Sequence, residues 1–366
     1  MRKKILLGIG GVIILLLLYL MFWPNPVQAV KVIPQQKMPE MSGDFEENII
    51  LREVKLLGEG VCLTPEDVAF DKQGRIYSGM VEKGDIMRFG SDGRNAEVFA
   101  NTGGKPAGLT FDSKGNLIVA DVEKGLLSID PQGKITTLVD SFEGEKLYMI
   151  NDLDIDSNGN IYFSQTSRKY PVDKMFYDIM EYRPNGRLFV YFPETKETQV
   201  LIEKLYFANG VAVSPDSTYV LVAETNAYRV SRYWIEGPQK GVQDIFIDNL
   251  PGLPDNIDFN GKDTYWLAIV DGPEQRKTLD GLLPHPFLRK IITRIPTFIT
   301  QPNSAGGCAF VLGLDIDGSI TYNLQDPKGE AYNNITSATE HNGNLYLGTN
   351  SHALNGIGII PIPEVE

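Results

Sequence analysis

The fold is decided by the stretch Ile150-Asn151-Asp152-Leu153-Asp154-Ile155-Asp156-Ser157-Asn158-Gly159-Asn160-Ile161-Tyr162. It holds two short runs of strand-forming residues around an Asp-Ser-Asn-Gly turn, which is typical of a β-hairpin. Similar stretches occur at residues 65–77 and 106–118. The turn residues Asp71, Asp112 and Asp156 are 41 and 44 positions apart. A repeat of this length, opening on a hairpin, predicts the blades of a β-propeller.

The opening strand of the hairpin recurs along the whole chain. Six such strands begin near residues 65, 106, 150, 208, 254 and 335, and further apolar runs predict four strands for each blade. The chain ends before the sixth blade has its outer strand, so we expect residues 48–54 to supply it and leave no free sheet edge. The sequence therefore predicts an all-β fold, a six-bladed β-propeller over residues 46–366, with an insertion at about 273–306.

The insertion has its own pattern. Apolar residues at positions 287, 288, 291, 292 and 295 follow helical spacing, with basic residues between them. Such a helix can pack on the ring, cover the mouth of the central tunnel as a lid, or touch lipid. These alternatives stay open at this point.

The N-terminus reads as a membrane segment. Met1-Arg2-Lys3-Lys4 precedes 19 apolar residues, Ile5 to Trp23, and a bilayer core needs about 20. A cleaved signal peptide, ending at Val27-Gln28-Ala29, is the alternative. The aromatic residues near the end of the run favour an uncut anchor over residues 1–23. The basic residues would stay in the cytoplasm, so the propeller would lie in the periplasm, lumen or extracellular space. Residues 24–45 then form a linker.

Composition excludes one class of partner. A net charge of -13 argues against nucleic-acid binding, which needs a basic face. The two cysteines, Cys62 and Cys308, can pair in an oxidising compartment because a closed ring brings its ends together. Two separate buried thiols are the alternative.

One position of the repeat carries the chemistry. The second residues of the six segments are Glu66, Ala107, Asn151, Asn209, Asp255 and Thr336. Equivalent positions in a ring point to one axis, so four of them, Glu66, Asn151, Asn209 and Asp255, would meet at its centre. Carboxylate and amide oxygens are ligands for a hard cation such as Ca²⁺. Asn256 is an additional candidate ligand.

A lone Asp or Asn near a strand end normally caps a turn. Asp154, Asp156 and Asp258 are accordingly assigned to turns or to the blade surface.

Several longer motifs indicate a family. They are YFPETKET at 191–198, LYFANGVA at 205–212, VAET at 222–225, RYW at 232–234 and LPGLPDNI at 250–257. Over about residues 105–350 the chain resembles the strictosidine synthase-like family and, more distantly, paraoxonases, gluconolactonases and diisopropyl fluorophosphatase. The resemblance implies a six-bladed propeller with calcium in its tunnel. In those hydrolases the ligands are Glu, Asn, Asn and Asp, which Glu66, Asn151, Asn209 and Asp255 match by type and blade.

The chain also departs from these relatives. Strictosidine synthase uses a Glu on the inner strand of its last blade, where this chain has Thr336. Paraoxonases carry a His in blade two, where this chain has Ala107. The three histidines, His285, His341 and His352, are assigned structural or surface roles.

These features together favour a calcium-dependent hydrolase of small lactones or aryl esters. Calcium would polarise the substrate carbonyl, and Asp255 would both bind calcium and activate water or attack directly. No Gly-x-Ser-x-Gly elbow indicates a serine hydrolase. The alternatives are a non-catalytic propeller that binds a ligand or partner and an amine-condensing lyase of the synthase type.

Overall fold

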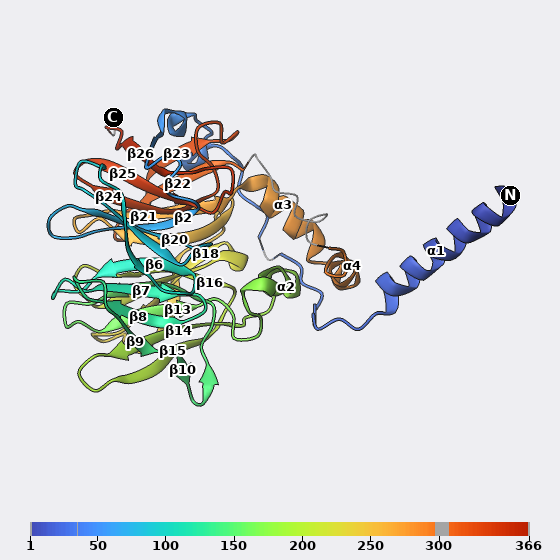
Figure 1. Ribbon diagram of the computed structural model, residues 1–366, viewed down its shortest axis with the longest axis horizontal. Coiled ribbons are helices and arrows are strands. Elements are labelled where there is room, and N and C mark those ends of the chain that lie inside the picture. Colours follow the sequence, from blue (N-terminus) through green and yellow to red (C-terminus); the bar gives the residue numbers. More distant parts are fainter. Residues whose placement is uncertain (1, 35, 297–306, 365–366) are drawn as a thin grey trace.

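The computed structural model describes residues 2–34, 36–296 and 307–364, with the backbone alone at 2, 3 and 5–7. Six four-stranded antiparallel sheets form the body of the protein, seen to the left in Figure 1. The innermost strands contact one another in cyclic order, from blade one through blade six and back to blade one. The predicted six-bladed β-propeller is therefore confirmed.

Each blade runs from an inner strand beside the tunnel to an outer strand at the rim. The strands of blades one to three are β2 (Pro65–Phe70), β3 (Ile76–Met80), β4 (Asp85–Phe89), β5 (Glu97–Asn101), β6 (Pro106–Phe111), β7 (Leu117–Asp121), β8 (Gly125–Ile129), β9 (Ile135–Val139), β12 (Ile150–Ile155), β13 (Ile161–Gln165), β14 (Gly186–Phe192) and β15 (Glu197–Leu205). Those of blades four to six are β16 (Ala208–Val213), β17 (Tyr219–Glu224), β18 (Arg229–Trp234), β19 (Gln243–Ile247), β20 (Leu253–Phe259), β21 (Tyr265–Asp271), β22 (Ala309–Leu314), β23 (Ile320–Asp326), β24 (Ile335–His341), β25 (Asn344–Thr349), β26 (Ile357–Pro361) and β1 (Lys55–Leu57). A small hairpin, β10 (Ser141–Phe142) and β11 (Glu145–Lys146), lies between blades two and three.

The repeated turn aspartates explain why the first hairpins form. Asp156 Oδ1 accepts hydrogen bonds from the backbone N–H groups of Asn158 (2.8 Å) and Asn160 (2.9 Å). Gly159 follows in the left-handed region, with φ of +85°, which glycine adopts at little cost. Asp71 and Asp112 bond their own turns in the same way. The turn assignment of Asp156 is therefore confirmed.

The hydrophobic core lies between neighbouring sheets. One cluster joins blade one to blade two, with Tyr77 and Ile86 packed near Leu117 and Leu127. Similar clusters join blades two and three and blades four and five. Since both faces of a blade are buried in this way, the second strands, such as β7, β17 and β21, read as almost continuous apolar runs with little alternation.

The ring closes by a strand from the N-terminal side, but not by the residues that we expected. β1 pairs with β26, Leu57 opposite Ile357. The expected segment 48–54 is instead largely a 3₁₀ helix, η2 (Ile50–Glu53), with Leu51 fully buried. Asn48 is fastened to β23, accepting a hydrogen bond from the N–H of Gln325 (2.9 Å). The chain is thus held against blade five until it reaches Lys55, which delays the closing strand.

Among the described residues, four α-helices accompany the ring: α1 (Arg2–Phe22), α2 (Met175–Glu181), α3 (Pro273–Leu282) and α4 (Pro286–Ile292). The remaining 3₁₀ helices are η1 (Gly43–Phe45), η3 (Val172–Lys174) and η4 (Thr225–Ala227). The helical spacing in the insertion is confirmed by α4, whereas residues 297–306 lie outside the described residues. Within the described part of the chain, no helix has both the length and the apolar content needed to cross a membrane.

Helices α2, α3 and α4 all lie on one face of the ring. The start of β12, Ile150, pairs with Gln165 at the end of β13, so the α2 loop leaves on the side where inner strands begin. The start of β20, Leu253, likewise pairs with Asp271, after which α3 and α4 follow. We call this side the upper face. Figure 1 shows α2, α3 and α4 between the sheets and α1.

Cys62 and Cys308 are free thiols. Cys62 is buried in the core cluster of blades one and six, whereas Cys308 packs beside Gly272 at the foot of the insertion. The unpaired alternative is therefore confirmed.

Candidate metal centre in the tunnel

A β-bulge interrupts every inner strand near its start. The ladder register shifts between Pro65 and Val68, between Ile150 and Leu153, between Ala208 and Val211, and at the matching places of the other blades. Bulges re-aim side chains away from the regular ladder. The residues at these bulges include Glu66, Asn151, Asn209, Asp255 and Asn256. The fold therefore places the first four predicted ligands at the equivalent position of their blades, and Asn256 one residue further along β20.

Several oxygens at this level have no protein partner. Among the described residues, the buried atoms without a hydrogen bond include Glu66 Oε2, Asn151 Oδ1, Asn209 Oδ1 and Asn256 Oδ1. Buried oxygens in proteins nearly always have a partner. Three of these atoms lie at equivalent positions of their blades and the fourth on Asn256, next to the equivalent Asp255. A bound cation would satisfy such a group of oxygens.

The amide nitrogens are used elsewhere, which leaves their oxygens free. Asn209 Nδ2 donates to Thr225 Oγ1 (3.2 Å), and that hydroxyl donates to the backbone oxygen of Pro254 (2.8 Å). Asn256 Nδ2 donates to Glu66 Oε1 (3.3 Å). Asn209 is thus oriented within its own blade and Asn256 by blade one, and the oxygen of each amide is available as a ligand.

The two carboxylates are in an environment that disfavours their charge. Glu66 and Asp255 are only 8% and 5% exposed. Burial raises the pKa of Glu66 well above its ordinary value, and the nearby Asp255 charge raises it further. Burial, then the Asp271 charge, raises the pKa of Asp255. A divalent cation at this level would offset both effects.

The donor set identifies the kind of ion. Within the described residues, no group of three or more His, Cys, Asp and Glu side chains is arranged to hold a metal. The candidate centre has two carboxylates and three amides. Oxygen-only ligands fit a hard cation such as Ca²⁺ rather than zinc, which prefers nitrogen and sulfur.

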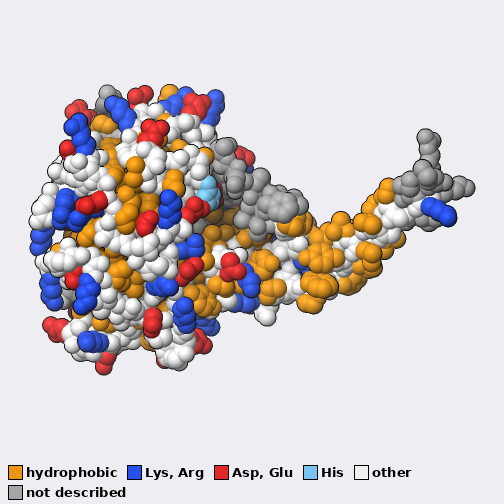
Figure 2. All heavy atoms as spheres, in the orientation of Figure 1, with side chains coloured by type: hydrophobic (Ala, Val, Ile, Leu, Met, Phe, Trp, Pro, Cys, Tyr) orange, Lys and Arg blue, Asp and Glu red, His pale blue; other side chains and the backbone are white. Residues whose placement is uncertain are grey.

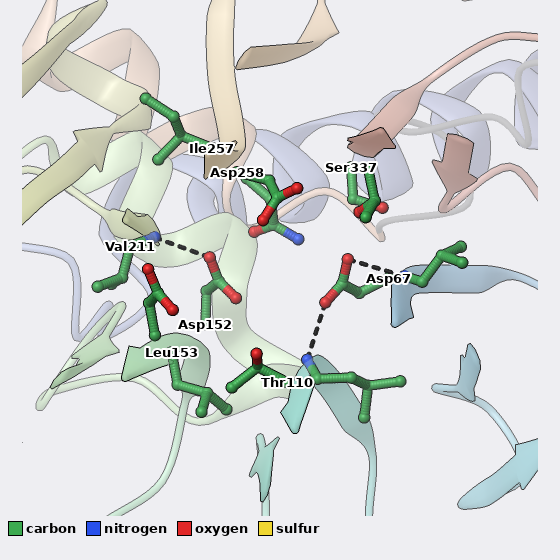
Figure 3. Close-up of a pocket in the computed structure, with 13 residues that line it drawn as sticks. Asp67, Thr110, Asp152, Leu153, Val211, Ile257, Asp258 and Ser337 are labelled. Carbon is green, nitrogen blue, oxygen red and sulfur yellow. Dashed lines mark hydrogen bonds between the residues drawn. The ribbon is translucent and has the colours of Figure 1, made fainter. Parts of the chain in front are cut away.

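A second group of acids lies deeper in the tunnel. Asp67, Asp152, Asp154 and Asp258 line a cavity of about 30 Å³, and Figure 3 shows three of them, Asp67, Asp152 and Asp258, around it. This volume holds roughly one water molecule. The assignment of Asp154 and Asp258 to turns or the blade surface was therefore wrong.

The tunnel acids have a structural role between blades. Inner strands of different blades do not pair with each other, so some of their backbone N–H groups face the tunnel and need another acceptor. Asp152 Oδ2 accepts from the N–H of Val211 (2.7 Å) and Asp154 Oδ2 from that of Val213 (2.7 Å), joining blade three to blade four. Asp67 Oδ2 accepts from the N–H of Leu109 (2.8 Å), joining blade one to blade two. We had not proposed Asp67 or Asp152, although each directly follows a predicted ligand.

The two repeat positions without a ligand have other roles. Thr336 Oγ1 donates to the backbone oxygen of Glu66 (2.6 Å), and Ser337 Oγ donates to the same oxygen (3.0 Å). Thr336 occupies the position where the synthase is expected to carry its catalytic Glu. Here its hydroxyl holds the backbone of Glu66 instead. Ala107 packs in an apolar cluster with Val122 and Met149.

None of the three histidines is among the residues that line the tunnel. His341 stacks on Phe70 with ring centroids 4.0 Å apart, His352 contacts Glu82 (2.8 Å), and the exposed His285 precedes α4. These contacts agree with the structural or surface roles expected from the sequence.

Fold and tunnel together define a class: six-bladed propellers whose inner strands present oxygen ligands to the central axis. Residues 151–238 match the family model for strictosidine synthase, and residues 43–89 match that for the N-terminal part of strictosidine synthase-like proteins. The adipocyte plasma membrane-associated protein of Salmo salar is 34% identical, covering 95% of this chain and 88% of that protein. Protein STRICTOSIDINE SYNTHASE-LIKE 6 of Arabidopsis thaliana is 36% identical, covering 82% and 80%. The chain therefore belongs to the strictosidine synthase-like family.

Solved structures show the same fold at low identity. A gluconolactonase from Xanthomonas campestris superposes with a TM-score of 0.61 at 15% identity, covering 93% of this chain and 99% of that one. The calcium-binding protein regucalcin from Agrobacterium tumefaciens superposes with a TM-score of 0.56 at 16% identity, covering 81% of this chain and 89% of that one. At these identities the likeness supports the architecture alone.

Proposed function

We propose that this protein is a calcium-dependent hydrolase of lactones or aryl esters. The observation that carries the proposal is a set of four buried oxygens without a hydrogen-bond partner among the described residues, on Glu66, Asn151, Asn209 and Asn256. Three of them belong to the second position of an inner strand, and the fourth belongs to the residue after Asp255. Such atoms are costly to bury unless a ligand satisfies them. The proposed substrate class is an analogy with the name of a solved neighbour of the same fold, a gluconolactonase.

The residues divide into holding and reacting groups. Glu66, Asn151, Asn209 and Asp255 would hold the ion, with Asn256 as an additional ligand. When bound, Ca²⁺ supplies positive charge that stabilises a developing oxyanion. Thr225 keeps the Asn209 oxygen turned toward the tunnel, and Thr336 fixes the backbone at Glu66.

Asp255 is the proposed reacting group. Its carboxylate lies at the upper level of the tunnel, among the strand starts, and the charge of Asp271 lies near it. A carboxylate in this position can take a proton from water or attack a carbonyl carbon. The synthase-type amine condensation would lack its acid–base carboxylate here, because the equivalent position holds Thr336. The Thr336 hydroxyl is hydrogen-bonded to the backbone of Glu66.

A non-catalytic role is the second candidate. The acid-lined cavity of the tunnel measures only about 30 Å³, which suits a single ion better than a bound substrate. In that case calcium would join the blades, and the protein would act through its surface.

Turnover separates these two candidates. Purified full-length protein is assayed with a panel of lactones and phenyl esters, in calcium and in chelator. Hydrolysis that disappears with chelator and returns with calcium supports the hydrolase. Absence of calcium-dependent turnover across the panel, together with calcium binding, supports the non-catalytic role.

We also propose that α1 attaches the protein to a membrane, with the propeller on the non-cytoplasmic side. Its large apolar side chains from Ile9 to Trp23 are exposed, and Figure 2 shows an almost continuous apolar surface along this helix. The name of the 34% identical relative from Salmo salar describes a plasma membrane-associated protein. Exposed apolar area of this extent needs lipid or a partner to cover it.

A further inference from the structure

Exposed apolar side chains gather on the elements next to α1. They are Val30 in the linker, Met175 in α2, and Phe287 and Leu288 in α4, which are 39%, 40%, 55% and 43% exposed. We call these four residues the apolar rim. Single exposed apolar residues are common on any protein. These four, however, lie on segments that contact one another on the upper face, beside the apolar surface of α1 in Figure 2.

Helix α4 is joined to the last turn of α1. Arg294 donates from Nε to the backbone oxygen of Trp23 (2.9 Å) and from Nη1 to that of Leu20 (2.9 Å). These carbonyls belong to the end of a helix, where they have no partner within it. Asn25 Nδ2 donates to the backbone oxygen of Lys290 (3.0 Å) and to Thr293 Oγ1 (2.8 Å). The level of α4 is therefore fixed relative to the end of α1.

The residues at this level are those found at a lipid–water boundary. Tyr19 donates to the backbone oxygen of Arg294 (3.4 Å), and Trp23 is 60% exposed. Tyr and Trp concentrate at membrane interfaces. Lys31, Lys174 and Lys290, from the linker, the turn before α2 and α4, add positive charge that attracts anionic lipid.

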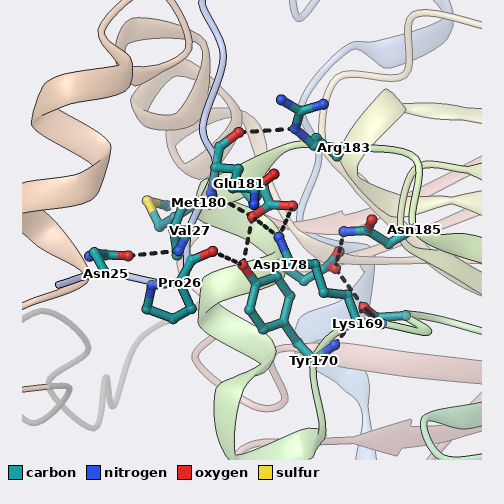
Figure 4. A network of polar contacts seen from close by, with 12 residues as sticks. Asn25, Pro26, Val27, Lys169, Tyr170, Asp178, Met180, Glu181, Arg183 and Asn185 are labelled. Carbon is teal, nitrogen blue, oxygen red and sulfur yellow. Dashed lines mark hydrogen bonds and ion pairs between the residues drawn. The ribbon is translucent and has the colours of Figure 1, made fainter.

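The linker is also fastened to the ring, as Figure 4 shows. The buried Glu181 accepts hydrogen bonds from the N–H of Gln28 (2.7 Å), from Lys169 (2.7 Å) and from the hydroxyl of Tyr170 (2.6 Å). Arg183 Nε donates to the backbone oxygen of Gln28 (2.9 Å). The ring is thus held in one orientation to α1, with its upper face on the side of α1.

We infer that the upper face lies on the phospholipid bilayer that holds α1, with the apolar rim in the boundary between headgroups and acyl chains. The candidate metal ligands sit at the strand starts of this same face, so the tunnel opens toward lipid. The substrate class that this geometry selects is an amphiphilic ester or lactone that partitions into the bilayer. The interface rests on the proposed membrane attachment, and the substrate class also rests on the proposed hydrolase.

The interface is tested without reference to activity. Full-length protein is placed in nanodiscs of phosphatidylcholine and phosphatidylserine, with photoreactive benzoylphenylalanine replacing Phe287. A matched protein carries it at Val242, which is 46% exposed at the edge of blade four. We expect lipid adducts at position 287 and not at 242. No lipid adduct at 287, equal adducts at both positions, or a cross-link from 287 to a second protein chain would each overturn the interface.

The substrate class has its own test. The double variant Phe287→Asp/Leu288→Asp should lower hydrolysis of a long-chain ester in the nanodisc by about tenfold, because the rim no longer enters lipid. Hydrolysis of a short soluble ester should not change. The control Val242→Asp/Ile245→Asp should affect neither. Equal loss on both esters overturns the substrate class. If the protein hydrolyses neither ester but still forms the lipid adduct at position 287, the proposed hydrolase activity is contradicted and the membrane interface is supported.

Discussion

Asn256 and Glu66 are hydrogen-bonded across the tunnel, with 3.3 Å between Asn256 Nδ2 and Glu66 Oε1. Blade six separates their two blades in the ring. Each residue also has an oxygen that lacks a partner among the described residues, Asn256 Oδ1 and Glu66 Oε2. The contact therefore positions two candidate ligands that are 190 residues apart in the chain.

Calcium should stabilise the folded protein. At a free concentration of 100 times its dissociation constant, an ion that binds only the folded state adds about 2.7 kcal/mol. The melting temperature should rise with calcium, fall with chelator, and respond less in Asn209→Ala. Asn158→Ala, in an exposed turn, is the control and should respond like the unmodified protein. A melting temperature that changes with neither calcium nor chelator would contradict the metal centre.

Asp255 and Glu66 should respond differently to neutralisation. Asp255→Asn keeps an oxygen ligand but loses the reacting carboxylate, so hydrolysis should fall by about 10²–10⁴-fold, more than calcium affinity does. Glu66→Gln should mainly weaken calcium binding, and added calcium should restore part of its activity. Both quantities are measured by titrating calcium in the hydrolysis assay. If both variants recover equally at high calcium, Asp255 is a ligand only.

The N-terminus should remain uncut in membranes, with the propeller protected on the non-cytoplasmic side. Terminal sequencing of the membrane fraction, combined with protease protection, checks both points. A mature protein that begins at Val30 would show that the apolar run is a cleaved signal peptide.

Asp178 should make stability depend on pH. Burial raises the pKa of this α2 carboxyl from 3.8 to about 6, so the folded state holds a proton that the unfolded state releases. The associated stability is present at low pH and is lost as pH rises through about 6. Asp178→Asn should keep the bonds that Ser167 and Asn185 donate to Oδ1 and remove the cost of ionisation.

The variant should therefore be more stable at pH 8 by about 2–3 kcal/mol and unchanged below pH 4. Chemical denaturation at both values measures the difference. A gain of equal size at both would show that ionisation is not the cause.

Gly210 should not tolerate a side chain. A Cβ there would lie 2.5 Å from the backbone nitrogen of Ile257 and 2.6 Å from the Cα of Asn256. Gly210→Ala should therefore destabilise the protein by about 1–3 kcal/mol and weaken calcium binding by displacing Asn256. Gly281→Ala, in open space on α3, is the control and should be neutral or slightly stabilising. Unchanged stability and calcium affinity in Gly210→Ala would show that β16 and β20 can move apart at no cost, and would contradict this prediction.

The repeat made the blades predictable because the hairpins of the first three blades are coded locally, by a turn aspartate and a following glycine. The ligand positions followed from the symmetry of a ring, which needs no knowledge of contacts. The tunnel acids Asp154 and Asp258 could not be found in this way. An inner-strand carboxylate that accepts an N–H from the next blade looks, in sequence, the same as one that caps a turn. The closing strand was misplaced because the fastening of Asn48 to β23 depends on tertiary contacts.

The pairing of Leu57 with Ile357 has a consequence for biosynthesis. Blade six needs strands from both ends of the propeller, so the ring cannot close before β26 has left the ribosome. Contacts of such long sequence separation form slowly. If α1 is held in the membrane from the start of translation, the first five blades must remain on the non-cytoplasmic side with β1 unpaired until β26 arrives. The emergence of β26 is then the event that allows the ring to close.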